Sequence, residues 1–255
     1  MSALRLLPAF ARLLAGFCFF AAAPVAALAG EFTVNPIRLE LGAQTRSGVI
    51  AVRNEGKDKL VVQMQAVDWT QDAQGADQYT PTQDLVFFPK IATIAPDEEA
   101  VIRIGTRQGA PATEKTYRLF IEELPGGDAP AGKGPRVTVL IRFGAPIFVK
   151  PAKPEDGLEV ESVQLVRGEF AAVVRNIGNQ HQMVQGLQLS GTDARGQEVF
   201  ALTLADRYLL AGTRKRYATT LTPEQCGRLA QLTLDVKTDK LERQAKLPVT
   251  RSMCP

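Results

Sequence analysis

Few side chains in this sequence of 255 residues could carry out catalysis or hold a metal ion. His181 is the only histidine, which removes most general-base and metal sites that depend on histidine. No G-x-S-x-G, Walker A or C-x-x-C motif is present. The acidic run Asp97–Glu99 is typical of a solvated turn, and His181 follows a turn as structural loop residues do. We therefore expect neither an enzyme nor a cofactor or metal site.

The first 29 residues are typical of a secretory signal peptide. Two arginines give a positive start, an apolar run covers residues 13–28, and Ala27 and Ala29 form the small-x-small pattern that signal peptidase reads. We expect cleavage after Ala29. The alternative is a membrane anchor, which is disfavoured because the apolar run is short and contains Pro24.

Cleavage changes the charge and the cysteine count of the chain. About 226 residues would remain, with a net charge of +1 instead of +3. So small a charge does not favour nucleic-acid binding, and no other stretch is apolar enough to insert into a membrane. Cys226 and Cys254 form an even pair in an exported chain, which indicates one disulfide. It would close a loop of about 29 residues and contribute about 3–4 kcal/mol.

The rest of the sequence alternates apolar and polar residues with period two and contains many turn residues, as β-strands and hairpins do. We expect about seven short strands before residue 150, at a spacing that favours an immunoglobulin-like β-sandwich. The polar connector 151–157 indicates a domain boundary. Further strands between residues 158 and 236, and one helical turn, follow it. The fold class is therefore all-β, with domains at 30–151 and 152–255.

A loop rich in glycine and proline, residues 125–135, leads into the expected strand 136–143. Four apolar side chains share one side of that strand because successive side chains alternate: Val137, Val139, Ile141 and Phe143. Two interpretations are open at this point. The strand either places this row in its own core, or it is an edge strand that offers the row to another chain by β-augmentation.

Several motifs occur in an order and spacing that match a known family. They include Phe32-Thr-Val-Asn-Pro-Ile-Arg38, Trp69-Thr-Gln71, Tyr117-Arg-Leu-Phe-Ile-Glu-Glu-Leu-Pro125 and Val137-x-Val139-x-Ile141-x-Phe143. With these motifs the chain resembles the PapD-like periplasmic pilus chaperones of the chaperone–usher pathway.

The resemblance implies two immunoglobulin-like domains in an L- or boomerang-shaped arrangement and a periplasmic location. Such chaperones bind pilus or fimbrial subunits by donor-strand complementation and deliver them to an outer-membrane usher. The apolar row of residues 137–143 would then be the donor strand. The alternative function is a secreted two-domain adhesin or structural binding protein.

The resemblance also implies a basic anchor for the subunit's C-terminal carboxylate in the cleft between the domains. Arg38 matches the first basic residue of this anchor, but Pro146 is found where the family has a lysine. This departure indicates a divergent branch of the family, with the archaic branch as one candidate, and makes Arg103 and Arg142 candidate replacements. An interdomain charge cluster is expected from Glu123, Lys150 and Asp239.

Overall fold

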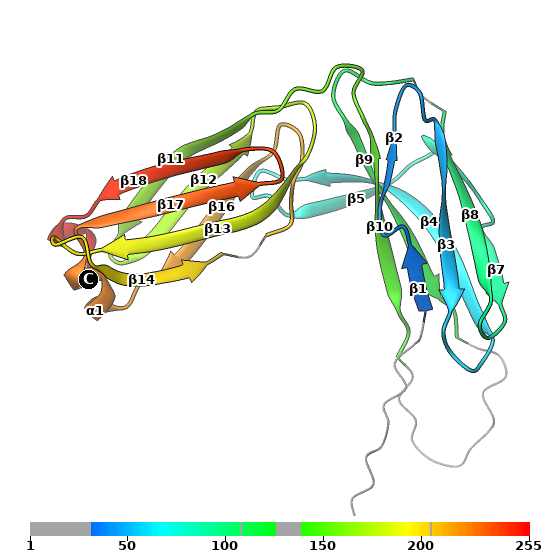
Figure 1. Cartoon of the computed structure of the whole chain (residues 1–255), viewed down its shortest axis with the longest axis horizontal. Coiled ribbons are helices and arrows are strands. Elements are labelled where there is room, and N and C mark those ends of the chain that lie inside the picture. The colour runs from blue at the N-terminus through cyan, green and yellow to red at the C-terminus, as the bar shows by residue number, and fades with distance from the viewer. Residues whose placement is uncertain (1–31, 108, 126–138, 205) are drawn as a thin grey trace, which may run out of the picture.

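A computed structural model of the protein describes residues 32–107, 109–125, 139–204 and 206–255. Two β-sandwiches follow each other along the chain with their long axes in different directions, so that the molecule is bent (Figure 1). The predicted fold of two immunoglobulin-like sandwiches in an L- or boomerang-shaped arrangement is confirmed. The predicted signal segment and Val137 lie outside the described residues.

The N-terminal sandwich consists of two sheets. The first contains, in spatial order, β1 (Phe32–Asn35), β3 (Ser47–Asn54), β8 (Glu99–Thr106) and β6 (Leu85–Phe88). The second contains β2 (Leu39–Leu41), β10 (Arg142–Val149), β9 (Lys115–Glu123), β4 (Leu60–Gln71) and β5 (Asp77–Pro81), and β7 (Ile91–Ile94) also pairs with β4. Alternate residues of both sheets meet in one apolar core, where Ile102 and Ile121 are completely buried.

The start of this domain crosses from one sheet to the other. β1 pairs antiparallel with β3, whereas β2 pairs parallel with the end of β10. The residues between them, Pro36–Arg38, carry the chain across the sandwich. This crossing places Arg38 immediately before β2 and therefore beside β10.

The C-terminal sandwich confirms the strands predicted between residues 158 and 236. One sheet contains β11 (Leu158–Val166), β12 (Glu169–Asn176) and β16 (Arg214–Thr220). The other contains β14 (Glu198–Thr203), β13 (Gln182–Thr192), β17 (Gln231–Thr238) and β18 (Glu242–Pro248), and β15 (Tyr208–Leu209) pairs with β13. The last strand of the first sandwich ends at Val149 and the first strand of the second begins at Leu158. Within this connector we keep residues 151 and 152 as the proposed boundary.

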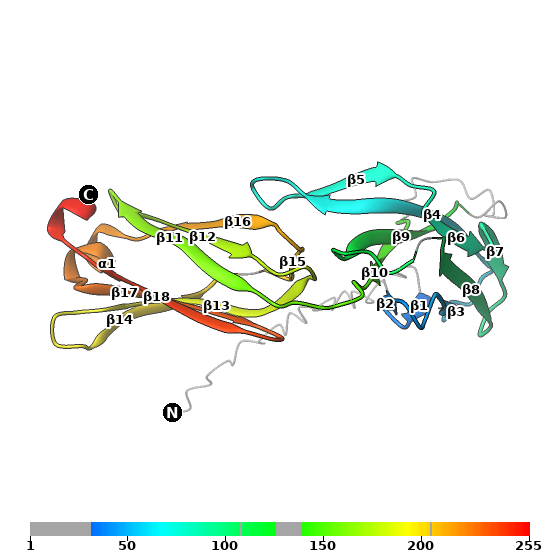
Figure 2. The same cartoon turned by 90° about the horizontal axis from the view of Figure 1, so that it is seen from above.

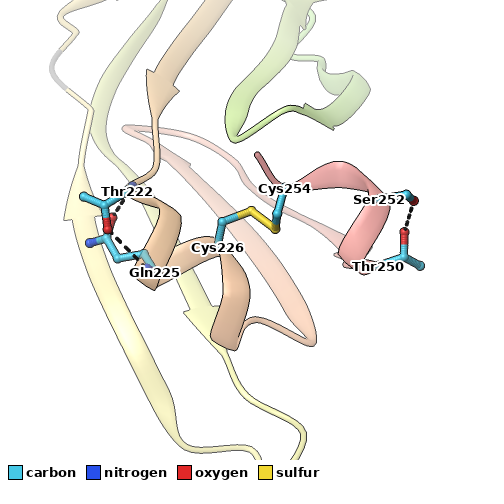
Figure 3. The surroundings of a disulfide bond; sticks show 6 residues. All are labelled: Thr222, Gln225, Cys226, Thr250, Ser252 and Cys254. Carbon is cyan, nitrogen blue, oxygen red and sulfur yellow. Dashed lines mark hydrogen bonds between the residues drawn. A yellow bond between two sulfur atoms is a disulfide. The ribbon is translucent and has the colours of Figure 1, made fainter.

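A disulfide ties the C-terminus to the short helix of this domain. Helix α1 (Pro223–Arg228) starts with a capping box, in which the Thr222 hydroxyl accepts from the backbone N–H of Gln225 and the Gln225 side chain accepts from the backbone N–H of Thr222. Cys226 on this helix is bonded to Cys254, which follows the 3₁₀ turn η1 (Arg251–Met253) (Figure 3). The predicted disulfide is therefore present in the structure.

The two sandwiches meet in a small apolar cluster. Trp69 and Phe148 come from the first sandwich, and Tyr208 and Leu210 come from the second. The Trp69 ring lies 5.4 Å from the Tyr208 ring in an edge-to-face arrangement. The β4–β5 hairpin reaches toward the second sandwich (Figure 2). Gln71 in this hairpin donates to the carbonyl of Tyr208 and accepts from the N–H of Leu210, both at 3.0 Å.

The single histidine also lies in this joint, where it is a structural loop residue, as predicted, that in addition contacts the other domain. His181 is buried and stacks on Phe148 with 3.7 Å between the ring centroids. One Glu114 carboxylate oxygen accepts from the backbone N–H of His181 at 2.7 Å and lies 2.8 Å from Nδ1. His181 therefore helps to dock the two domains.

Candidate functional site

Strand β10 has one open edge. It pairs with β9 along its whole length, from Arg142 to Val149. On its other side β2 reaches only Ile147–Val149. Among the described residues, the segment Arg142–Pro146 therefore has a neighbouring strand on one side only. A second chain could add a strand here.

The hydrogen bonds show which backbone groups of β10 face this open edge. The carbonyl of Ile141 accepts from Glu123 on the β9 side, and the N–H of Lys150 donates to Leu41 on the β2 side. Because the register between these two points has no shift, residues 142, 144 and 146 direct their backbone groups away from β9. Arg142 and Gly144 offer N–H groups there, whereas Pro146 has none.

The predicted donor row is only partly exposed. Val139 is 59% exposed, Ile141 is half-buried, and Phe143 packs against the N-terminal core. Among the described residues of the expected strand, regular strand structure begins at Arg142, and Leu140 is exposed as well. The apolar segment thus changes gradually from exposed to buried as it enters β10.

Arg38 lies at the end of the open edge, on the side of the domain joint. Its Nη1 approaches the Met183 sulfur at 3.6 Å, and its Nε lies 3.9 Å from Glu40. Lys150 binds the other Glu40 oxygen at 2.5 Å. Burial acts to raise the pKa of Glu40, but the hydrogen bond and charge of Lys150, together with the charge of Arg38, hold it below its ordinary value. Arg38 itself is 40% exposed and can reach a ligand.

Arg118 lies on the opposite side of the same position. It pairs with Pro146 across β9 and β10, while Arg38 precedes the residue of β2 that pairs with Ile147. The backbones of the two arginines are therefore about two strand spacings apart, or about 10 Å, with Pro146 between them. Both side chains contact the joint, because Arg118 stacks 3.8 Å above the Trp69 ring.

The Arg118 side chain is held in place by two further interactions. Its Nη1 donates to the carbonyl of Gly144 at 3.0 Å, and its Nη2 lies 3.8 Å from Asp77. Its Nε is buried without a hydrogen-bond partner. Sequence reasoning missed this residue, because only the strand register places it opposite Pro146.

The two arginines named from sequence as replacements for the family lysine occupy other places. Arg103 lies on β8 in the other sheet, opposite Val49 and Phe88. Arg142 stacks 3.8 Å above the Phe120 ring at the far end of the open edge. Neither is adjacent to Pro146.

The residues of the expected interdomain charge cluster have separate partners. Lys150 pairs with Glu40, and the Glu123 carboxylate accepts from the N–H of Ile141 at 3.3 Å. Asp239 accepts from the N–H of Met183 at 2.8 Å. Within the described parts of the chain, no ion pair joins the three.

The described residues contain no group of histidine, cysteine, aspartate and glutamate side chains that could hold a metal ion. In the same residues no helix has the length and apolar character needed to cross a membrane.

Solved structures with a similar fold include several pilus chaperones. A chain of the CsuC–CsuE chaperone–tip adhesion subunit complex from archaic Csu pili of Acinetobacter baumannii has 18% identity and a TM-score of 0.58, and the match covers 87% of this chain and 100% of that one. The YadV chaperone has 13% identity and a TM-score of 0.58, with 85% and 99% covered. A chain from the Salmonella enterica SafA pilin–SafB chaperone complex has 14% identity and a TM-score of 0.55, with 87% and 99% covered.

The comparison with curated proteins finds no match. The family model described as "Pili and flagellar-assembly chaperone, PapD N-terminal domain" matches residues 31–155. This range includes the open edge of β10 and the two arginines beside Pro146. Residues 31–155 of the chain therefore belong to the family of PapD N-terminal domains of pili and flagellar-assembly chaperones, and the fold of both sandwiches is similar to that of solved pilus chaperones.

Proposed function

We propose that this protein binds pilus subunits by donor-strand complementation and delivers them to an outer-membrane usher. Pilus chaperones of this family are periplasmic. We further propose that the chain reaches the periplasm through the signal peptide and is cleaved after Ala29. The proposed mechanism is binding alone and includes no covalent step.

The open edge of β10 is the observation that carries this proposal. A subunit that lacks one strand of its sandwich exposes an apolar groove and two unpaired strand edges, which are prone to aggregation. The edge Arg142–Pro146 supplies backbone groups to such a strand, and the preceding residues supply apolar side chains. Each side chain that becomes fully buried contributes about 1.5–3 kcal/mol.

The donor residues are expected to contribute unequally. Val137 stays in the proposal from its sequence pattern alone. Val139 and Ile141 retain exposed surface that a subunit can bury. Phe143 already packs against the core of its own domain, so it has less surface to offer.

We propose that Arg38 and Arg118 together anchor the subunit's C-terminal carboxylate. They lie on either side of Pro146, the position at which the family's lysine is missing. A guanidinium can donate two parallel hydrogen bonds to a carboxylate, so the pair can satisfy both oxygens. We therefore propose Arg118, and not Arg103 or Arg142, as the second member of the anchor.

A second exposed surface fits the usher. The outer face of the β3–β8–β6 sheet includes an apolar group of side chains around Arg103: Val49, Val86, Phe88 and Val101. Phe88 is 73% exposed, and Arg103 has no ion-pair partner among the described residues. This face belongs to the sheet that does not contain β10, so a subunit on β10 leaves it accessible. We propose that it receives an apolar segment of the usher that also carries an acidic residue.

Subunit capture is tested by placing a charge in the donor row. Ile141→Asp should abolish recovery of co-expressed pilus subunits from the periplasm, because a carboxylate would be buried in the apolar groove of the subunit. Val166→Asp is the matched control, since Val166 is an exposed apolar residue on a strand of the other domain. Unchanged subunit recovery with Ile141→Asp would contradict the proposed function.

A further inference from the structure

Met183 links the second domain to the first residue of the proposed anchor. Its sulfur accepts a hydrogen bond from Nη1 of Arg38 at 3.6 Å. Its backbone is held on both sides, because its N–H donates to the Asp239 carboxylate at 2.8 Å and its carbonyl accepts from the N–H of Asp239 at 2.9 Å. The side chain also packs against the apolar cluster of the domain joint. In this structure Met183 therefore takes up one of the donors of Arg38.

The strength of this contact depends on the oxidation state of the sulfur. A thioether is a weak acceptor, so it yields readily to a carboxylate, which forms charge-assisted hydrogen bonds with a guanidinium. Hydrogen peroxide converts a methionine to its sulfoxide. The S–O bond forms as the O–O bond breaks, the sulfur gives up two electrons, and the second oxygen leaves as water with both protons. The sulfoxide oxygen is a far better acceptor, and it would be attached to the sulfur that already faces Nη1 of Arg38.

The other methionines in the described part of the chain do not combine exposure with this contact. Met64 is only 3% exposed and belongs to the N-terminal core. Met253 is partly exposed, as Met183 is, but it lies in η1 beside the disulfide and packs against the C-terminal core. A protein of the periplasm works in an oxidising compartment. Met183 is thus the partly exposed methionine whose oxidation would act on Arg38.

We propose that Met183 is an oxidation site that controls the anchor: its sulfoxide engages Arg38 and thereby lowers the affinity for the subunit's terminal carboxylate. The inference rests on the proposed function and adds a regulatory modification to it. Methionine sulfoxide is reduced back by dedicated reductases, so the effect is reversible. Subunit capture would then decrease while peroxide is present and recover afterwards.

Two synthetic peptides measure the anchor directly. Both copy the last strand of a pilus subunit that co-purifies with the protein, one with a free C-terminal carboxylate and one with an amide. The unoxidised wild-type protein should bind the free acid about tenfold more tightly than the amide. After treatment with hydrogen peroxide and its removal, this preference should fall below about threefold. Peptide mass spectrometry reports the oxidation of Met183, and reductases for both sulfoxide epimers should restore the preference.

Three variants show whether the effect acts through this sulfur. Met183→Leu has no oxidisable atom at the position, so peroxide should not change its preference. Met183→Gln places an amide oxygen near Arg38 and should show a reduced preference without any peroxide. Met253→Leu is the matched control, because it removes the other partly exposed methionine, and it should respond to peroxide as the wild type does.

The outcomes separate this inference from the proposed function. The inference is wrong if oxidised Met183 leaves the preference intact, if Met183→Leu responds as the wild type does, or if peroxide oxidises Met253 but not Met183. A red shift in the emission of Trp69, the only tryptophan, would mean that oxidation opens the joint, which would also overturn it. If the unoxidised protein shows no preference, the anchor fails, and if it binds neither peptide, the proposed function fails; in both cases this inference fails too.

Discussion

Removing the Glu114 carboxylate should uncouple the two domains. The side chain is completely buried and that of His181 is 5% exposed, so water cannot replace the interaction. Glu114→Ala would leave the backbone N–H and the Nδ1 of His181 without their acceptor. An unsatisfied buried donor costs about 1–3 kcal/mol. We therefore expect docking of the domains to weaken by at least about 1–3 kcal/mol, the cost of one unsatisfied buried donor.

Trp69 provides the assay, because this single tryptophan is 1% exposed and lies in the joint. Its emission should shift to the red at a lower urea concentration in Glu114→Ala than in the wild type. Glu114→Gln keeps one acceptor oxygen and should lose less, and Glu155→Ala removes an exposed carboxylate from the connector as a control. A free energy of unfolding for Glu114→Ala within about 0.5 kcal/mol of this control would refute the reasoning.

Four further changes test other parts of the structure. Arg38→Ala should weaken capture of a subunit with an intact C-terminus about tenfold to a hundredfold in a binding titration, since hydrogen bonds to charged groups contribute about 1.5–3 kcal/mol; equal affinity would argue against the anchor. Cys226→Ser should destabilise the C-terminal domain by about 3 kcal/mol in calorimetry, and an unchanged transition would mean that the disulfide does not stabilise this domain. Phe88→Ser should retain the subunit but lose usher binding in a pull-down, and loss of both would contradict two separate surfaces. Because the pKa of Glu40 is lowered, its contribution to stability is present above the ordinary carboxyl range and is lost as the pH falls through the folded value; Glu40→Gln should make unfolding less dependent on acid, and an identical pH profile would contradict this.

The alternating segments of the sequence predicted most of the fold, because burial on one face of a strand leaves a pattern with period two. The sequence did not predict β18, because the side chains of Glu242–Pro248 are mostly exposed and therefore show no repeating apolar positions. Arg38 could be named because it belongs to a recognisable motif. Arg118 also lies in a family motif, Tyr117–Pro125, but its candidate role in the anchor depends on its pairing with Pro146. Pairing between strands cannot be seen in the sequence of one segment.

The joint shows a second limit of sequence reasoning. His181 follows a turn, and the residues next to it do not reveal that Glu114 approaches from the other domain. For Glu123, Lys150 and Asp239 the sequence shows charges of opposite sign that could pair, but the fold gives each residue a different partner. Contacts between domains depend on how the sandwiches dock, and local pattern contains no information on this.

The two edges of the six-stranded sheet support the assignment of β10 as the functional one. β5, at one edge, is exposed throughout and carries Asp77 and Pro81, as strands do that must not pair with other chains. The open part of β10, at the other edge, follows exposed Val139 and Leu140, and its proline comes only at the end. A sheet that protects one edge and leaves apolar side chains beside the other is organised to accept a strand at a single place. Since an unprotected apolar edge promotes aggregation, its retention is best explained by a partner that covers it.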